Sequence, residues 1–389
     1  MHPNSSSTSS SDGSAWKGVR LGVVTLVSMM LWLIAIDLVA GFFVGTPYGH
    51  ESMRAGQLTR YFDYGRSVEG KVRAMVGPEG TLPPPLVQAG WIEPPSDQPV
   101  RAGKGQDLLV AVYGMSFAVN IAKHMQDEDK RIALRLAGGP GATLSHSYAL
   151  YNADRGHHEA DVVVLGILAS SLPALMTISH MTWNFEEPSP HFYPRFSVVD
   201  GKLSRYSPSV STLAQLQAAS RDESRWRAVV DELSSHDAFY DPLVFRSWSL
   251  DESVLARLAR RGWGQSRKRA SIDRFHDTAG YTNELGLLDV TRALVTAFIT
   301  QVRSDGKLPV VLAINDRGYP DHLHRVLAPI VAGSGAVYLS THEVAPASDA
   351  SNFLKDGHFV PAKDRLIALK LSELINARLN RRQGALPPT

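Results

Sequence analysis

The stretch DLLVAVYGMSFAVNIAKHMQ (residues 107–126) decides the fold. Its first eight residues are mostly apolar, which is typical of a buried strand, and FAVNIAKHMQ then has the pattern of a helix. Further apolar runs follow at 131–139, 160–168, 307–316 and 335–341, with helical patterns among them. Strands of this kind that alternate with helices predict a parallel sheet covered on both faces. We therefore expect a three-layer α/β/α sandwich around five parallel strands.

Composition narrows the range of functions. The 389 residues carry a net charge of +2, and no basic stripe marks a nucleic-acid-binding protein. The chain has no cysteine, which excludes disulfides, zinc–thiolate sites and thiol catalysis. Ligands of parallel sheets bind beyond the carboxyl ends of the strands. The residues directly after each strand are therefore the candidates for a functional site.

The N-terminus indicates a membrane anchor. Residues 1–20 begin with a serine-rich stretch and are predicted to be a disordered cytoplasmic tail. Residues 21–44 form an apolar run with one charge, Asp37, and a run of this length crosses a bilayer as a helix. Because Lys17 and Arg20 precede it, we expect a single-pass inner-membrane protein whose C-terminal domain is periplasmic or extracellular. The alternative is a buried core helix.

The composition of residues 45–389 divides this part of the chain into a linker, a domain and a short tail. Residues 45–104 are dense in proline and glycine and predict a stalk or linker. The alternating strand and helix pattern covers residues 105–380, and residues 381–389 form a short tail. A stretch at about 172–284 has helical pieces and no strand rhythm, so we interpret it as a mainly helical insertion that caps the site.

Three segments that follow strands carry candidate chemistry. Ser116 opens a helix directly after the first strand, where its oxygen would project at the sheet edge; an ordinary helix N-cap is the alternative. The glycine-rich segment 137–148 can offer backbone N–H groups to an oxyanion or a phosphate. Asp356 and His358 lie in a loop after the last strand. A histidine can accept the serine proton while an acid orients its ring, so we expect these three side chains to meet.

His157, His158 and Glu159 look like a metal-binding cluster. They precede the third strand, at the edge opposite the expected site, and adjacent histidines point apart. We interpret them as a solvated loop.

These segments resemble the blocks of the SGNH (GDSL-like) hydrolase superfamily, over roughly residues 105–380. VAVYGMSF resembles the first block and puts Ser116 at the nucleophile position, and KDGHFVPAKDRLIA resembles the last, with His358 as general base and Asp356 as its orienting acid. AGGPGATLSH resembles the second block, in which Gly141 best matches the glycine whose N–H binds the oxyanion. The resemblance implies a flavodoxin-like sandwich and ester or acyl-transfer chemistry, with no metal and no organic cofactor.

The sequence departs from the family pattern at two places. Met115 stands where the family usually has aspartate, and DVVVLGIL (161–168) lacks the asparagine that completes the oxyanion hole. Asn184 or Ser170 would have to replace that donor. The Asp-x-His spacing resembles that of membrane-tethered relatives that acetylate or deacetylate exopolysaccharides.

The resemblance therefore implies a membrane-anchored serine esterase or O-acyltransferase. Its substrate would be an acylated small molecule or a glycan of the cell envelope that carries O-acetyl groups. The alternative is an inactive SGNH-fold component of an envelope polysaccharide assembly, and the sequence names no protein partner.

Overall fold

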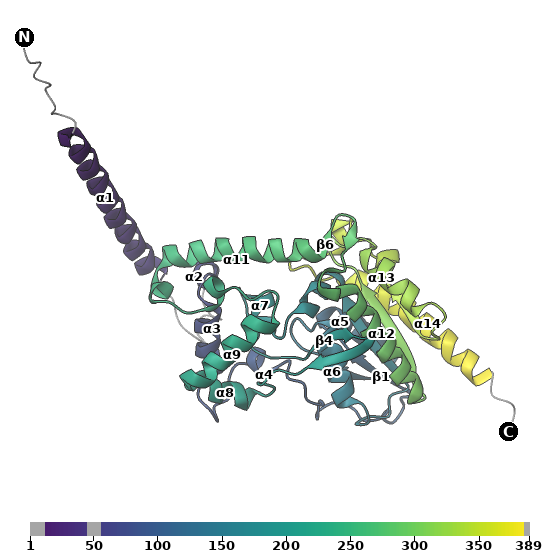
Figure 1. Cartoon of the computed structure of the whole chain (residues 1–389). Helices are drawn as coiled ribbons and strands as arrows, with labels where there is room; N and C mark the ends of the chain where they lie inside the picture. Colours follow the sequence, from purple (N-terminus) through teal and green to yellow (C-terminus); the bar gives the residue numbers. More distant parts are fainter. Residues whose placement is uncertain (1–11, 45–55, 385–389) are drawn as a thin grey trace, which may run out of the picture.

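The computed structural model describes residues 12–44 and 56–384, and its centre is a five-stranded parallel sheet (Figure 1). The strand order is β2-β1-β3-β8-β9, and every neighbouring pair is parallel. This is the flavodoxin-like order, which reverses between β1 and β3. The predicted fold class and all five predicted strands are confirmed. The strand bounds are β1 (Leu108–Tyr113), β2 (Ile132–Ala137), β3 (Val162–Leu168), β8 (Leu308–Ile314) and β9 (Val337–Ser340).

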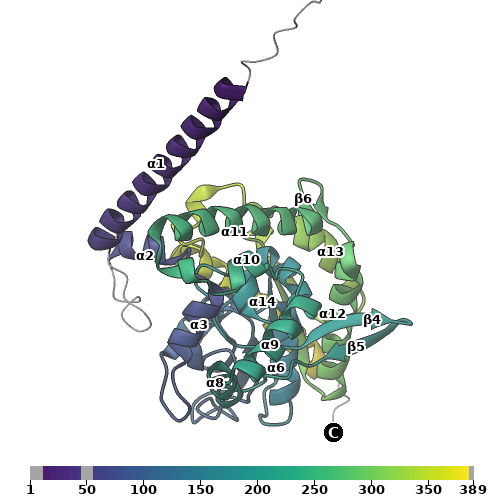
Figure 2. The same cartoon turned by 60° about the vertical axis from the view of Figure 1, so that its left-hand side comes forward.

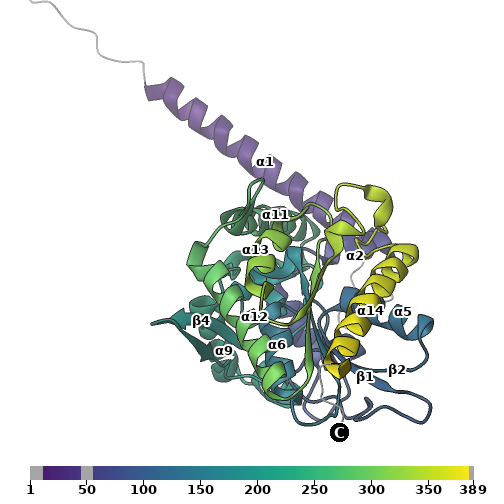
Figure 3. The ribbon, with the colours of Figure 1, turned by 90° about the vertical axis from the view of Figure 1, so that its right-hand side faces the viewer.

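Helices cover both faces of the sheet, as the apolar strands require. Helices α5 (Ser116–Glu128) and α14 (Pro361–Gly384) pack against one face, and α6 (Leu144–Asp154), α12 (Leu287–Ser304) and α13 (His322–Val331) pack against the other (Figure 3). Every residue of β3 and β8 is buried. Because both faces of these central strands are covered, their sequences show no alternation between apolar and polar residues.

The insertion forms a second packed region beside the sheet. Its helices are α7 (His180–Trp183), α8 (Leu213–Arg221), α9 (Glu223–His236), α10 (Pro242–Phe245) and α11 (Val254–Phe275). Helix α11 runs along one side of this region toward α13 (Figure 2). Short 3-10 helices complete the elements: η2 (Ala169–Met176), η3 (Ser249–Glu252), η4 (Glu284–Gly286), η5 (Thr341–Glu343) and η6 (Ala350–Asn352).

The insertion also contains strands that the sequence analysis missed. An antiparallel hairpin joins β4 (Arg195–Val199) to β5 (Lys202–Tyr206), and a two-residue pair joins β6 (His276–Asp277) to β7 (Gly280–Tyr281). Asp200 and Gly201 connect β4 to β5 with φ angles of 51° and 73°. An Asp-Gly pair suits this turn because it tolerates positive φ at both positions. The Asp200-Gly201 dipeptide is therefore the feature of the sequence from which the hairpin could have been predicted.

The segment predicted as a linker is folded where it is described, and residues 45–55 lie outside the described residues. It contains α2 (Gln57–Asp63), α3 (Val68–Val76) and α4 (Pro85–Gln88). Val72, Val76 and Val87 are buried with Trp226 of α9 in a third apolar cluster. The helices therefore belong to the insertion's core.

A buried cation fixes the proline-rich part of the same segment. Arg135 on β2 pairs with Asp154, and its guanidinium also donates to the backbone carbonyls of Pro95, Gln98 and Pro99. Prolines leave carbonyls without matching N–H groups, and Arg135 supplies the missing donors. The contact holds the proline-rich chain against the sheet.

The N-terminal helix α1 (Asp12–Val44) projects away from the folded body (Figure 1). It begins at Asp12, within the predicted tail, whereas residues 1–11 lie outside the described residues. The most apolar 18-residue window within residues 16–44 has a mean hydropathy of 2.4, and none of that window is buried. A second apolar stretch, Glu284–Ser304, passes the same test of length and composition, but it includes α12, which packs in the core. Helix α1 therefore fits a single membrane anchor.

Candidate active site

Ser116 is the first residue of α5 and lies directly beyond the carboxyl end of β1. Met115 occupies the N-cap position without a side-chain cap, so Ser116 is not the helix cap that was its alternative interpretation. The serine is exposed, and its Oγ lies 2.7 Å from Nε2 of His358. The structure thus joins two residues that are 242 positions apart.

His358 is oriented by its loop and by α5. Phe353 and Phe359 form an antiparallel bridge that closes the loop, and the N–H of Leu354 donates to the His358 carbonyl at 2.7 Å. The imidazole stacks on the Phe117 ring with centroids 4.6 Å apart. Since Phe117 follows the serine directly, α5 sets both the position of Ser116 and the plane of the His358 ring.

Asp356 contacts His358 at two points. Its Oδ2 lies 3.2 Å from Nδ1 of His358, and its Oδ1 accepts the backbone N–H of His358 at 3.1 Å. The backbone N–H, followed by the imidazole, lowers the pKa of the Asp356 carboxyl below its ordinary value. An ionised acid against Nδ1 keeps the proton on that nitrogen and leaves Nε2 able to accept from the serine. Ser116, His358 and Asp356 therefore form a continuous chain of polar contacts.

The glycine-rich loop after β2 packs against the turn between β1 and Ser116. A Cβ on Gly138 would lie 2.0 Å from the carbonyl oxygen of Gly114, which immediately precedes Met115. Gly141 has a φ of 62°, and a Cβ there would lie 2.1 Å from Nε2 of His180. A side chain at either position would clash, which explains the glycines. The loop is thereby held next to β1 and α7.

His180 is a site residue that the sequence analysis missed. Its Nδ1 accepts the backbone N–H of Ser189 at 3.2 Å, so the proton of the neutral ring is on Nε2, which faces Gly141. Burial, with a smaller contribution from the charge of Lys268, lowers the pKa of His180 to about 3. The ring is therefore a neutral hydrogen-bond donor at neutral pH.

A cavity of about 830 Å³ opens beside the Ser116–His358 pair. Ser116 and His358 do not line it themselves, but their neighbours Met115 and Asp356 do. Asn184 is also on its wall, with its amide donating to the backbone carbonyl of Glu187 at 3.2 Å. The cavity thus brings together Met115 after β1, Gly141 after β2, Tyr319 after β8, Asp356 after β9, and His180 and Asn184 of the insertion.

The end of β3 carries no asparagine side chain, and the residues there make other contacts. Gly166 lies within β3, where a Cβ would come within 2.5 Å of the Ala118 side chain of α5. Ser170 lines the cavity, and its N–H donates to Asp316 at 3.0 Å. Burial raises the pKa of Asp316 to about 6. The ends of β3 and β8 are therefore tied to each other at the cavity.

Comparisons with known proteins add little information on function to the geometry of the site. A search against protein-family models and a search of curated proteins each find no match. Among solved structures, a protein described as belonging to the G-D-S-L lipolytic family, from Desulfitobacterium hafniense DCB-2, is similar at 9% identity and a TM-score of 0.32. The likeness covers 69% of this chain and 99% of that one. We therefore base the functional conclusion on the side chains of the site.

Proposed function

We propose that the protein is a membrane-anchored serine esterase or O-acyltransferase. The observation that carries the proposal is the chain from Ser116 Oγ through His358 to Asp356, with contacts of 2.7 and 3.2 Å. A nucleophile within hydrogen-bonding distance of a base, which an acid orients, is the arrangement of covalent acyl transfer.

The reaction would proceed in two halves. His358 Nε2 takes the proton of Ser116 as Oγ bonds to the ester carbonyl carbon. The same nitrogen then returns the proton to the departing alcohol oxygen as the ester bond breaks. Water, or a sugar hydroxyl, next attacks the acyl carbon and gives its proton to His358, which passes it to Ser116 Oγ as the bond between that oxygen and the acyl carbon breaks. Water yields a free acid, and a sugar hydroxyl yields a new ester.

The oxyanion would be stabilised mainly by backbone donors. The N–H of Ser116 lies in the first turn of α5, where helix N–H groups have no intrahelical partner and the dipole favours negative charge. The N–H of Gly141 is the second proposed donor. For the third, Asn184 remains a candidate, and His180 joins it because its Nε2–H faces Gly141.

The cavity suits a polar, acylated substrate such as a glycan. Eight of its lining residues are arginine, lysine, aspartate or glutamate: Arg60, Asp63, Arg66, Lys71, Glu186, Glu187, Lys268 and Asp356. Tyr64, Trp183 and Tyr319 add aromatic surface. A lipid chain would desolvate such polar groups without hydrogen-bonding to them. We therefore favour O-acetyl groups of envelope glycans over long-chain esters, with the domain on the outer side of the inner membrane.

Ester turnover by the full-length protein tests the proposal. Ser116→Ala and His358→Ala are each expected to lower kcat/KM for a p-nitrophenyl acetate substrate by at least about 10³-fold. Ser171→Ala is the matched control, since it removes a serine that lines the same cavity but whose hydroxyl donates to the Leu168 carbonyl at 2.8 Å, and it should leave turnover near wild type. Adding acetylated and unacetylated glycans then separates hydrolysis from transfer. A folded wild-type protein that turns over neither p-nitrophenyl acetate nor the acetylated glycan would instead support the alternative, an inactive component of an envelope assembly.

A further inference from the structure

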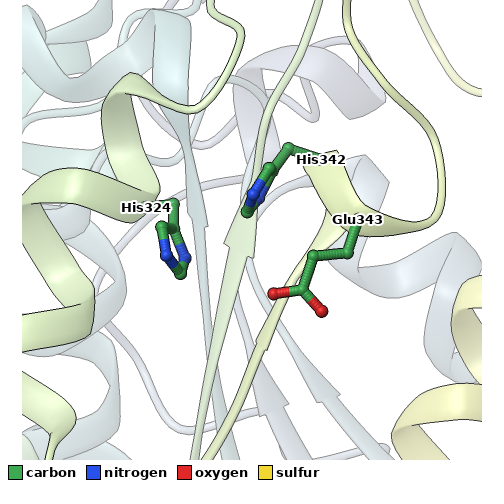
Figure 4. A group of neighbouring side chains, drawn as sticks. All are labelled: His324, His342 and Glu343. Atoms are coloured by element: carbon green, nitrogen blue, oxygen red, sulfur yellow. The ribbon is translucent and has the colours of Figure 1, made fainter.

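A second group of side chains lies at the same edge of the sheet, beyond the edge strand β9. His324 is in the first turn of α13, and His342 and Glu343 belong to η5, directly after β9. Figure 4 shows the three side chains turned toward a shared space. One possible ligand atom from each lies within 4.8 Å of the others. None of these residues belongs to the proposed serine site.

Each of the two imidazoles contacts a hydroxyl group through its Nδ1 atom. Nδ1 of His342 lies 2.7 Å from Ser340 Oγ, which also accepts the Nδ2–H of Asn315 at 2.8 Å. Nδ1 of His324 lies 3.3 Å from the Tyr338 hydroxyl. When Nδ1–H donates to such an oxygen, Nε2 keeps its lone pair for a metal ion. Second-shell partners of this kind accompany most histidine ligands of metals.

The donor set fits a borderline transition-metal ion. Two imidazole nitrogens and one carboxylate oxygen are ligands that Zn²⁺ accepts, at about 2.0–2.2 Å, with a fourth position left for water. Both histidines are half-buried, whereas Glu343 is exposed and its side chain can rotate to close the site.

We propose that His324, His342 and Glu343 bind one divalent transition-metal ion of the zinc class. The ion would join the start of α13 to the end of β9. It would also fasten the first residues of the segment that leads from η5 to Asp356 and His358.

The test is metal binding by the full-length protein, purified in detergent with a tag that contains no histidine. Co²⁺ serves as the spectroscopic probe, and Zn²⁺ is then measured by competition with a chromophoric chelator. We expect one equivalent of each, with Zn²⁺ displacing Co²⁺. His342→Ala and Glu343→Gln should each weaken binding by at least about 100-fold, and Ser340→Ala by about 10- to 100-fold.

His276→Ala is the matched control. His276 Nε2 lies 2.7 Å from Nδ1 of His322, so this variant removes a nearby histidine that belongs to a separate imidazole pair. It should bind metal like the wild type, and because Glu343 is exposed, Glu343→Gln should fold normally by circular dichroism. No stoichiometric binding by the wild type, or equal loss in the control and the ligand variants, would overturn the proposal.

Discussion

At the residue scale, sequence reasoning selected the proposed nucleophile, base and acid because each follows a strand. Parallel strands bring their carboxyl ends to one edge, so Ser116 and His358 could be expected together despite their separation in the chain. His180 could not be found this way, because only the close approach of Gly141 to its ring reveals its place. The interpretation of His158 as part of a solvated loop is wrong. It is buried, with Nε2 2.9 Å from the Tyr113 hydroxyl.

Replacing the orienting acid tests the proposed proton relay. Asp356→Asn keeps the size of the side chain but can stabilise the wrong tautomer of His358 and cannot stabilise the imidazolium. We expect kcat to fall on the order of 10²- to 10⁴-fold with KM nearly unchanged. Because Asp356 is exposed and anchored only locally, the melting temperature should stay close to wild type. Steady-state kinetics and thermal melts check both expectations, and an unchanged kcat would contradict the role of Asp356.

Buried His146 predicts a pH-dependent stability. Burial lowers its pKa to about 4, against about 6.5 in an unfolded chain, and its Nε2 lies 2.7 Å from the Gly90 carbonyl. Below pH 6.5 the unfolded chain takes up a proton that the folded protein does not, so stability falls as the pH drops. This contribution amounts to about 2 kcal/mol at pH 5.

His146→Gln removes that titration while keeping a donor for Gly90. Denaturant unfolding at pH 7 and pH 5 should show the variant gaining about 2 kcal/mol relative to wild type at the lower pH. Each comparison is made at one pH, so the remaining titrating groups cancel. A constant difference between the two proteins at both pH values would show that His146 does not titrate in this way.

At the scale of elements, the single charge of the apolar N-terminal run has a structural role. Asp37 of α1 accepts the Ser253 hydroxyl at 3.0 Å and the N–H of Leu255 at 2.8 Å, at the start of α11. A carboxylate there is stabilised by unpaired N–H groups and by the helix dipole. The sequence could show only that Asp37 lay near the end of the run, because its partner is more than 200 positions away.

Removing this contact should loosen the start of α11. For Asp37→Ala we expect amide hydrogen exchange at Leu255 to accelerate about 5- to 30-fold, which corresponds to the roughly 1–2 kcal/mol of a lost helix cap. Amides in the middle of α12 serve as internal controls and should exchange at the wild-type rate. Unchanged exchange at Leu255 would mean that α1 does not hold α11 in the full-length protein.

At the scale of the whole molecule, the central sheet could be predicted from the sequence, but the packing of residues 56–104 against the insertion and the sheet could not. Strands β1, β3 and β8 are continuous apolar runs whose burial follows from their sequence alone. The segment predicted as a linker instead packs its valines against Trp226, and the buried Arg135 fastens its proline-rich part. The composition of this segment suggested an extended chain. Local sequence does not reveal that Trp226 supplies an apolar surface for its valines or that Arg135 supplies hydrogen-bond donors for its carbonyls.

The anchor is also a property of the whole molecule. Removing residues 1–44 should move the protein from the membrane fraction to the soluble fraction, since α1 alone combines length, hydropathy and exposure among the described helices. The apolar helix α12 should not retain it, because that helix is buried against the sheet. Cell fractionation of the full and shortened proteins checks this. Continued membrane association of the shortened protein at high salt would show another site of attachment.

The central claim is that Ser116 is an activated nucleophile. Its most direct test is labelling of the full-length protein with a fluorophosphonate probe, followed by mass spectrometry of the labelled peptide. We predict a single adduct on Ser116, lost in Ser116→Ala and in His358→Ala and retained in Ser171→Ala. A folded wild-type protein that stays unlabelled, or that carries the adduct on another residue, would contradict the account.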